Sequence, residues 1–79
     1  MENLLKYNEI FTKVFNVKEN MLDKSFTFKD VDAWDSIAHL SLISELEDTF
    51  DIMFETEDIL HYESYLNGLN ILRKYGVEI

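Results

Sequence analysis

The sequence predicts an all-α domain of four helices. Apolar residues recur at intervals of three and four in separate segments, and residues that can cap a helix stand before these segments. The long connection over residues 17–35 lacks the alternation of a β-strand, and the chain has no internal repeat or low-complexity stretch. We expect one domain over residues 1–79, a helical bundle with a long first crossover and a short third helix.

The first helix is expected over residues 4–15, after the potential cap Asn3. Its apolar face consists of Leu4, Tyr7, Ile10, Phe11, Val14 and Phe15. Asn16 can adopt the left-handed conformation that ends a helix. The connection that follows carries five apolar anchors, which we expect to cover the open side of the bundle: Met21, Leu22, Phe26, Phe28 and Val31.

The second helix begins at Asp35 or Ser36, either of which can cap it, and continues to Phe50 along a regular apolar stripe. A short helix is expected over residues 57–60, with Thr56 as its cap and acids in its first turn, where the helix dipole favours them.

The last helix follows the cap Ser64 and stops at Gly76. Gly68 in its interior costs about 1 kcal/mol relative to alanine, so either a neighbour packs closely there or the position has drifted. The expected core comprises Leu4, Tyr7, Phe11, Val14, Phe28, Leu40, Ile43, Leu46, Phe50, Phe54, Leu66 and Leu69. We expect Phe50 to contribute most to it.

Acidic residues dominate the second half of the chain. The formal charge is −9, and the stretch from Asp30 to Leu72 holds eleven acids and no Lys or Arg. Nucleic acid is therefore excluded as a partner of this half, because binding a polyanion requires basic residues. A partner with a basic surface would be attracted instead.

Cysteine is absent, so the fold contains neither a disulfide nor a thiolate metal site. No stretch approaches the ~20 apolar residues of a membrane span, and the N-terminus does not read as a signal peptide. We expect a monomeric, cytoplasmic protein without a membrane partner.

The most informative segment, residues 32–40, reads Asp-Ala-Trp-Asp-Ser-Ile-Ala-His-Leu and places Ser36 in the first turn of the second helix. A hydroxyl there is exposed, rigidly placed and clear of hydrolysing groups. Asp-Ser-Ile alone can open any capped helix. Further stretches that fit one family pattern follow at residues 45–50, Phe54, Glu57 and residues 62–66. Together they make the chain resemble the acyl carrier proteins from about Val17 to Tyr75.

This resemblance implies that a phosphopantetheinyl transferase moves 4'-phosphopantetheine from coenzyme A onto Ser36, next to the acidic Asp35. The thiol of the arm would hold acyl groups as thioesters and present them to ligases, transferases and synthases of a fatty-acid, polyketide or specialised biosynthetic pathway. The chain itself would be a non-catalytic carrier. Trp34 either contacts the arm or folds back onto the core, and Ile37 either docks partner enzymes or begins the core stripe.

The resemblance also implies a docking surface for enzymes with basic surfaces, which comprises Ile37, Ser41, Glu45, Glu47, Asp48 and Glu57. Compared with common fatty-acid carriers, Ala38 and Ser41 replace early acids of this helix. The segment Asp32-Ala33-Trp34 looks more like that of discrete carriers in specialised biosynthetic clusters. Tyr62 stands where a small aliphatic residue often lines the acyl pocket, which indicates a short or absent cavity.

Other functions are consistent with parts of the sequence. His39 shares a helix face with Ser36, as a serine hydrolase would need, but no nucleophile elbow or oxyanion hole accompanies the pair. Asp30 and Asp32 begin like a calcium loop, yet Asp35 and Ser41 stand where that loop needs glycine and glutamate, so no metal site is predicted. A peptidyl or aminoacyl carrier, or an unmodified helical interaction module, would share the same overall sequence pattern.

Overall fold

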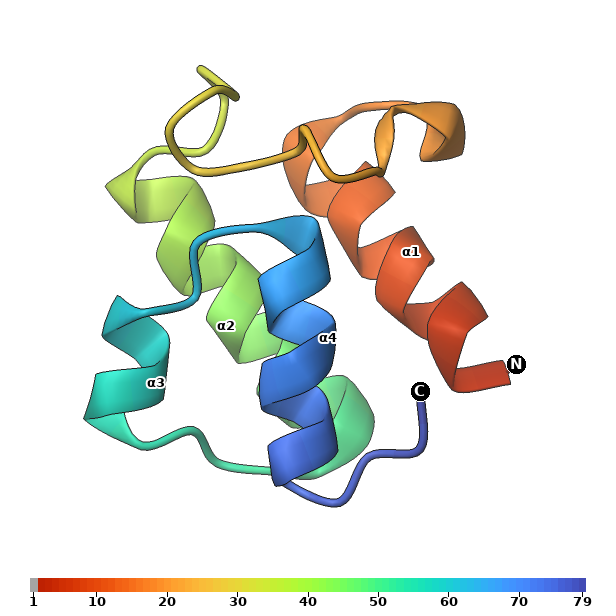
Figure 1. Ribbon diagram of the computed structural model, residues 1–79, viewed down its shortest axis with the longest axis vertical. Helices are drawn as coiled ribbons and strands as arrows, with labels where there is room; N and C mark the ends of the chain where they lie inside the picture. The colour runs from red at the N-terminus through yellow and green to blue at the C-terminus, as the bar shows by residue number, and fades with distance from the viewer. Residues whose placement is uncertain (1) are drawn as a thin grey trace.

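The computed structural model describes residues 2–79, and this part of the chain contains four α-helices, one 3-10 turn and no β-strand. The elements are α1 (Glu2–Phe15), η1 (Glu19–Met21), α2 (Ser36–Phe50), α3 (Thr56–Leu60) and α4 (Tyr65–Lys74). In Figure 1 the long connection after α1 crosses the top of the molecule to reach α2, and the short α3 lies beside α4. The predicted all-α class is confirmed for these residues. None of their helices combines the length and the apolar character that crossing a bilayer requires.

The ends of the helices follow local sequence signals. Asn16 ends α1 with a φ of 54°, in the left-handed region. The Asp35 carboxylate accepts a hydrogen bond from a backbone N–H in the first turn of α2. Ser64 and Asn67 form a reciprocal capping box at the start of α4. Thr56 was predicted to cap the short helix and is instead its first residue.

The core is built mainly from aromatic rings. Trp34, Tyr7, Tyr62 and Phe11 are the largest side chains with almost no exposed surface. The Phe11 ring packs edge-on against Trp34, with 5.8 Å between the ring centroids. The buried hydrophobic residues are Tyr7, Ile10, Phe11, Phe15, Phe26, Trp34, Leu42, Ile43, Leu46, Phe54, Tyr62, Tyr65, Ile71 and Leu72.

The buried face of α2 differs from the predicted one. Ile43 and Leu46 are buried as predicted, together with Leu42, but Leu40 is 64% exposed. Phe50 is only partly buried, so it is not the largest contributor to the core. Apolar residues stand on more than one side of α2, and the periodicity alone therefore did not decide which side faces inward.

The buried face of α4 is also shifted. It consists of Tyr65, Gly68, Ile71 and Leu72, and Leu66, which was predicted to be buried, is 44% exposed. A buried face that includes a glycine gives a weak hydrophobic signal, and this explains the error. Leu4, Val14 and Leu69 are partly buried at the edge of the core.

The connection before α2 is tied to the start of α4. The backbone N of Phe28 donates to the oxygen of Glu63 at 2.8 Å, and the N of Tyr65 donates to the oxygen of Phe26 at 2.9 Å. Phe26 is buried, as predicted for an anchor. Met21 and Phe28 are 56% and 47% exposed, so the prediction that they are buried anchors is wrong.

Candidate functional site

Ser36 is the first residue of α2 and is exposed. The carboxylate of Asp35 accepts a hydrogen bond from the backbone N of Ala38 at 2.8 Å, and its carbonyl accepts one from the N of His39 at 2.8 Å. These bonds hold the backbone on both sides of Ser36 in one conformation. The start of α2 therefore presents the Ser36 hydroxyl to solvent from a rigid position.

A largely apolar pocket of about 310 Å³ opens beside Ser36. It is lined by Phe28, Ser36, His39, Leu40, Ile59, Leu60, Tyr62 and Glu63. These residues come from the long connection, from α2, from α3 and from the segment before α4. Phe28 and Leu40, which were predicted to lie in the core, are exposed and line this pocket.

Trp34 belongs to the core and is only 2% exposed. Its indole N–H donates to Nδ1 of His39 at 3.0 Å. Because an indole nitrogen can only donate, Nδ1 is unprotonated and Nε2 carries the proton, which it donates to the oxygen of Ile59 at 2.8 Å. Of the two interpretations of Trp34, the one that folds it onto the core is correct, and its side chain is not part of the exposed site.

The hydrogen bonds of His39 argue against the serine-hydrolase alternative. Both ring nitrogens of His39 are engaged, one with the Trp34 indole and the other with the backbone of α3. In this arrangement neither nitrogen is free to take the proton of the Ser36 hydroxyl. His39 instead ties the first turn of α2 to α3.

Tyr62, which is 1% exposed, forms the floor of the pocket. The Tyr7 hydroxyl donates to the backbone oxygen of Tyr65 at 2.7 Å, so in the 2.8 Å bond between the two hydroxyls Tyr62 is the donor. A Cβ at Gly68 would overlap both hydroxyls. Burial raises the pKa of Tyr62 and of Tyr7 above the ordinary value for tyrosine, so both hydroxyls keep the protons that these hydrogen bonds need.

Four of the predicted docking residues are free at the surface. Ile37 is 79% exposed, which favours the docking interpretation over a place in the core. Ser41, Asp48 and Glu57 are exposed as well.

The other two predicted docking residues make contacts within the chain. Glu45 Oε1 pairs with the Nζ of Lys13 on α1 at 3.1 Å. Glu47 Oε2 accepts a hydrogen bond from the backbone N of Phe54 at 2.9 Å. Glu47 therefore stabilises the turn after α2, and replacing it would test the fold as well as docking.

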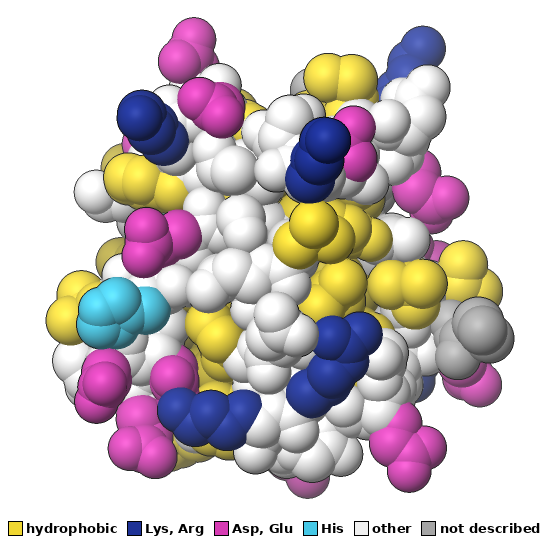
Figure 2. All heavy atoms as spheres, viewed as in Figure 1, with side chains coloured by type: hydrophobic (Ala, Val, Ile, Leu, Met, Phe, Trp, Pro, Cys, Tyr) yellow, Lys and Arg dark blue, Asp and Glu magenta, His cyan; other side chains and the backbone are white. Residues whose placement is uncertain are grey.

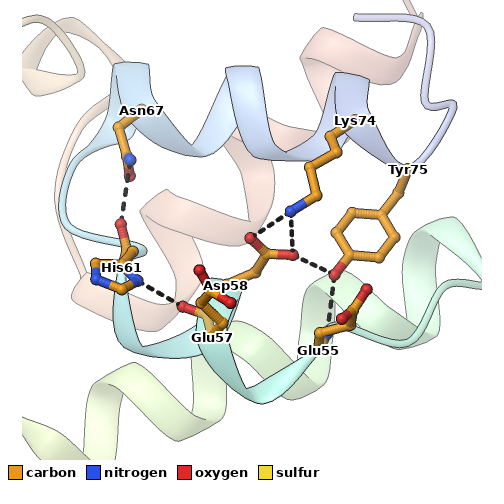
Figure 3. A network of polar contacts seen from close by, with 7 residues as sticks. All are labelled: Glu55, Glu57, Asp58, His61, Asn67, Lys74 and Tyr75. Atoms are coloured by element: carbon orange, nitrogen blue, oxygen red, sulfur yellow. Dashed lines mark hydrogen bonds and ion pairs between the residues drawn. The ribbon is translucent and has the colours of Figure 1, made fainter.

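A cluster around Asp58 fastens α3 to the end of α4. The Nζ of Lys74 donates to the two carboxylate oxygens at 2.8 and 2.9 Å, and the Tyr75 hydroxyl donates to one of them (Figure 3). The Tyr75 oxygen also accepts from the backbone N of Glu55 at 2.8 Å. The hydrogen bonds from Lys74 and then from Tyr75 lower the pKa of the Asp58 carboxyl. This Asp58 cluster positions the helix that forms one wall of the pocket.

Two features that shape the site were not predicted from the sequence. The acids of α3 were attributed to the helix dipole, whereas Asp58 pairs with residues sixteen and seventeen positions later. Gly68 was expected to have a close neighbour or to have drifted, and the tyrosines that pack there were not named. Two signals were available in the sequence, a glycine inside a helix and a tyrosine at position 62. Neither signal showed which residues pack against each other.

Figure 2 shows several acidic side chains near the histidine at the left of the view, with a basic side chain beside them. Within residues 2–79, no group of three or more His, Asp or Glu side chains is placed to hold a metal ion. The site thus consists of an exposed serine, an apolar pocket and an acidic surface.

Comparison with known proteins found no match for this chain among family models, curated proteins or solved structures.

Proposed function

We propose that this chain is an acyl carrier protein, a four-helix bundle of the acyl-carrier type in which Ser36 bears 4'-phosphopantetheine. The observation that carries the proposal is the exposed Ser36 hydroxyl at the rigid start of α2, on the edge of an apolar pocket. The resemblance in sequence extends over most of the chain and adds support. The protein itself performs no catalysis in this proposal.

Loading of the carrier is a phosphoryl transfer that another enzyme catalyses. The oxygen of the Ser36 hydroxyl bonds to the phosphorus that carries pantetheine, and the pyrophosphate bond of coenzyme A breaks. The hydroxyl proton is lost and adenosine 3',5'-bisphosphate leaves. When bound, the arm supplies a thiol that holds an acyl group as a thioester.

The surface around the site supports partners with basic docking surfaces. No Lys or Arg occurs between Asp30 and Leu72, and Asp48 and Glu57 are exposed. Ile37 adds an exposed apolar residue directly after Ser36. Such a surface attracts a transferase or synthase by charge and offers it an apolar contact.

Intact-protein mass after incubation with coenzyme A and a broad-specificity phosphopantetheinyl transferase tests the proposal. We expect the wild-type chain to gain the mass of one phosphopantetheinyl group and Ser36→Ala to gain nothing. Ser44→Ala, which changes an exposed serine of α2 outside the predicted docking surface, should be modified like the wild type. If the folded wild-type chain gains no mass, the proposal fails and an unmodified interaction module becomes the better assignment.

A further inference from the structure

The pocket beside Ser36 is small, and the buried side chain of Tyr62 lines it. Phe28, Leu40 and Leu60 form apolar walls that are 47–71% exposed, whereas Tyr62 at the floor is 1% exposed. The volume of about 310 Å³ lies at the small end of ligand pockets, which span about 300–1,000 Å³. A small group therefore fits, and a long chain would have to displace the floor.

Tyr62 is held in place on three sides. Its hydroxyl donates to the Tyr7 hydroxyl at 2.8 Å, and Tyr7 in turn donates to the backbone oxygen of Tyr65 at 2.7 Å. Beneath the two hydroxyls, α4 provides Gly68, where there is no room for even a Cβ. Phe54 packs edge-on against the Tyr62 ring, with 6.1 Å between the centroids. Moving Tyr62 aside would break a buried hydrogen bond and repack the core.

We propose that Tyr62 is a specificity-determining residue that limits the cargo sheltered by this pocket to short, uncharged acyl groups. The apolar walls favour an uncharged cargo, because burying a charged group without a partner is costly. A longer chain stays outside the protein interior. This inference rests on the proposed function, because it requires a cargo attached at Ser36.

The test compares chain lengths on the same protein. The chain is loaded by a phosphopantetheinyl transferase with butyryl or dodecanoyl phosphopantetheine from the corresponding coenzyme A thioesters, and the melting temperature of each form is compared with that of the unacylated holo form. For the wild type we expect butyryl to raise the melting temperature by roughly 4 °C, and dodecanoyl to raise it no further. A progressive rise from butyryl to dodecanoyl in the wild type overturns the proposal without any mutant.

Replacing the floor should lengthen the cargo that the protein shelters. In Tyr62→Leu, the space above Gly68 becomes available, and dodecanoyl should stabilise the protein several degrees more than butyryl does. Phe15→Leu is the matched control, because it shortens a buried aromatic residue that does not line the pocket, and its preference should stay that of the wild type. If both variants respond alike to dodecanoyl, general loosening of the core is the cause and the role of Tyr62 is rejected.

If the proposed function itself were wrong, the chain would gain no mass on loading. The chain-length preference is measured separately, only on protein whose mass shows full acylation. Tyr62→Phe covers the case in which Tyr62→Leu does not fold. It keeps the ring that closes the pocket and loses only the hydroxyl, so it should retain the preference for butyryl, and a shift towards dodecanoyl in this variant contradicts a steric role for the ring.

Discussion

At the scale of single residues, Gly68 and Tyr62 define the interior beneath the candidate site. Gly68 lies inside α4 and lowers the stability of this helix, because glycine loses more backbone freedom on folding than other residues do. The benefit lies in the space above it, which the hydroxyls of Tyr62 and Tyr7 occupy. Their hydrogen bond keeps two buried polar groups satisfied, and so the glycine, the two tyrosines and the floor of the pocket form one packed unit.

Gly68→Ala should destabilise the protein, although alanine favours a helix. The gain in helix propensity is about 1 kcal/mol, and we expect the cost of displacing two buried tyrosines to exceed it, for a net loss of about 2 kcal/mol. Chemical denaturation followed by circular dichroism measures the change.

Asn70→Ala serves as the control on the same helix, because Asn70 is exposed, and it should change the stability by less than about 0.5 kcal/mol. Gly68→Ala combined with Tyr62→Leu should show a smaller extra cost than Gly68→Ala does in the wild type. An alanine variant as stable as the wild type would falsify the packing argument.

At the scale of elements, α3 depends on its neighbours. It has five residues and no side-chain cap at its start, and a helix of that length is not stable alone. His39 holds it from α2 through the backbone of Ile59, and the Asp58 cluster holds it from α4. Because α3 forms one wall of the pocket, these contacts also decide the shape of the candidate site.

The Asp58 cluster should stabilise the fold in a pH-dependent manner. The pKa of Asp58 is lowered in the folded chain, mainly by the hydrogen bond from Lys74. An aspartate in an unfolded chain has a pKa of about 3.9. The contribution is therefore complete above about pH 4 and is lost as the pH falls through the lower folded-state value. Asp58→Asn should have a lower denaturation midpoint than the wild type at pH 7, and the difference should shrink below about pH 4.

Glu57→Gln is the control for this experiment, because it removes an exposed carboxylate from the same helix. Its midpoint should stay close to that of the wild type at pH 7. A difference between Asp58→Asn and the wild type that persists unchanged at acid pH would mean that the ionised carboxylate is not what fastens α3.

At the scale of the whole molecule, the interior and the surface treat polar groups differently: buried polar groups are paired, whereas the surface carries an excess of negative charge. Within residues 2–79 every buried side-chain nitrogen or oxygen has a hydrogen-bond partner, so the interior stabilises a single arrangement. The surface instead carries a large excess of carboxylates, with a formal charge of −9 for the chain. That excess favours encounter with basic partners more than it favours folding.

Reversing exposed charges near the proposed docking surface should slow loading. We expect Asp48→Lys with Glu57→Lys to lower the kcat/KM of a basic-surfaced phosphopantetheinyl transferase roughly tenfold at low salt and to flatten its dependence on ionic strength. The rate is measured from the mass change of the carrier over time.

Glu2→Lys with Glu9→Lys is the matched control, since both double variants change the formal charge equally and the control residues lie on α1. We expect the control to be loaded nearly as fast as the wild type. Equal slowing in the two variants would mean that net charge alone matters and that the partner docks elsewhere.

Local signals predicted the secondary structure well and the burial less well. Asn16, Asp35 and Ser64 act within one turn of their own positions, so the sequence around each was sufficient to predict these three helix ends. Asn3 and Thr56, which were predicted to cap helices, lie inside α1 and α3 instead. The burial of α2 and α4 depends on which partners pack against each helix. Leu40 and Leu66 were therefore misplaced, because an apolar residue at helical spacing can face a pocket as well as a core.

The sequence by itself determined the all-α class, the order of the four helices, the acidic surface and the position of Ser36 at the start of α2. All of these follow from neighbours within a few residues or from composition. Only the tertiary structure decided that Trp34 is buried, that Tyr62 rests on Tyr7 above Gly68, and that Asp58 binds the end of α4. These contacts join positions up to 55 residues apart, and their energies depend on shape and burial that exist only once the helices are packed.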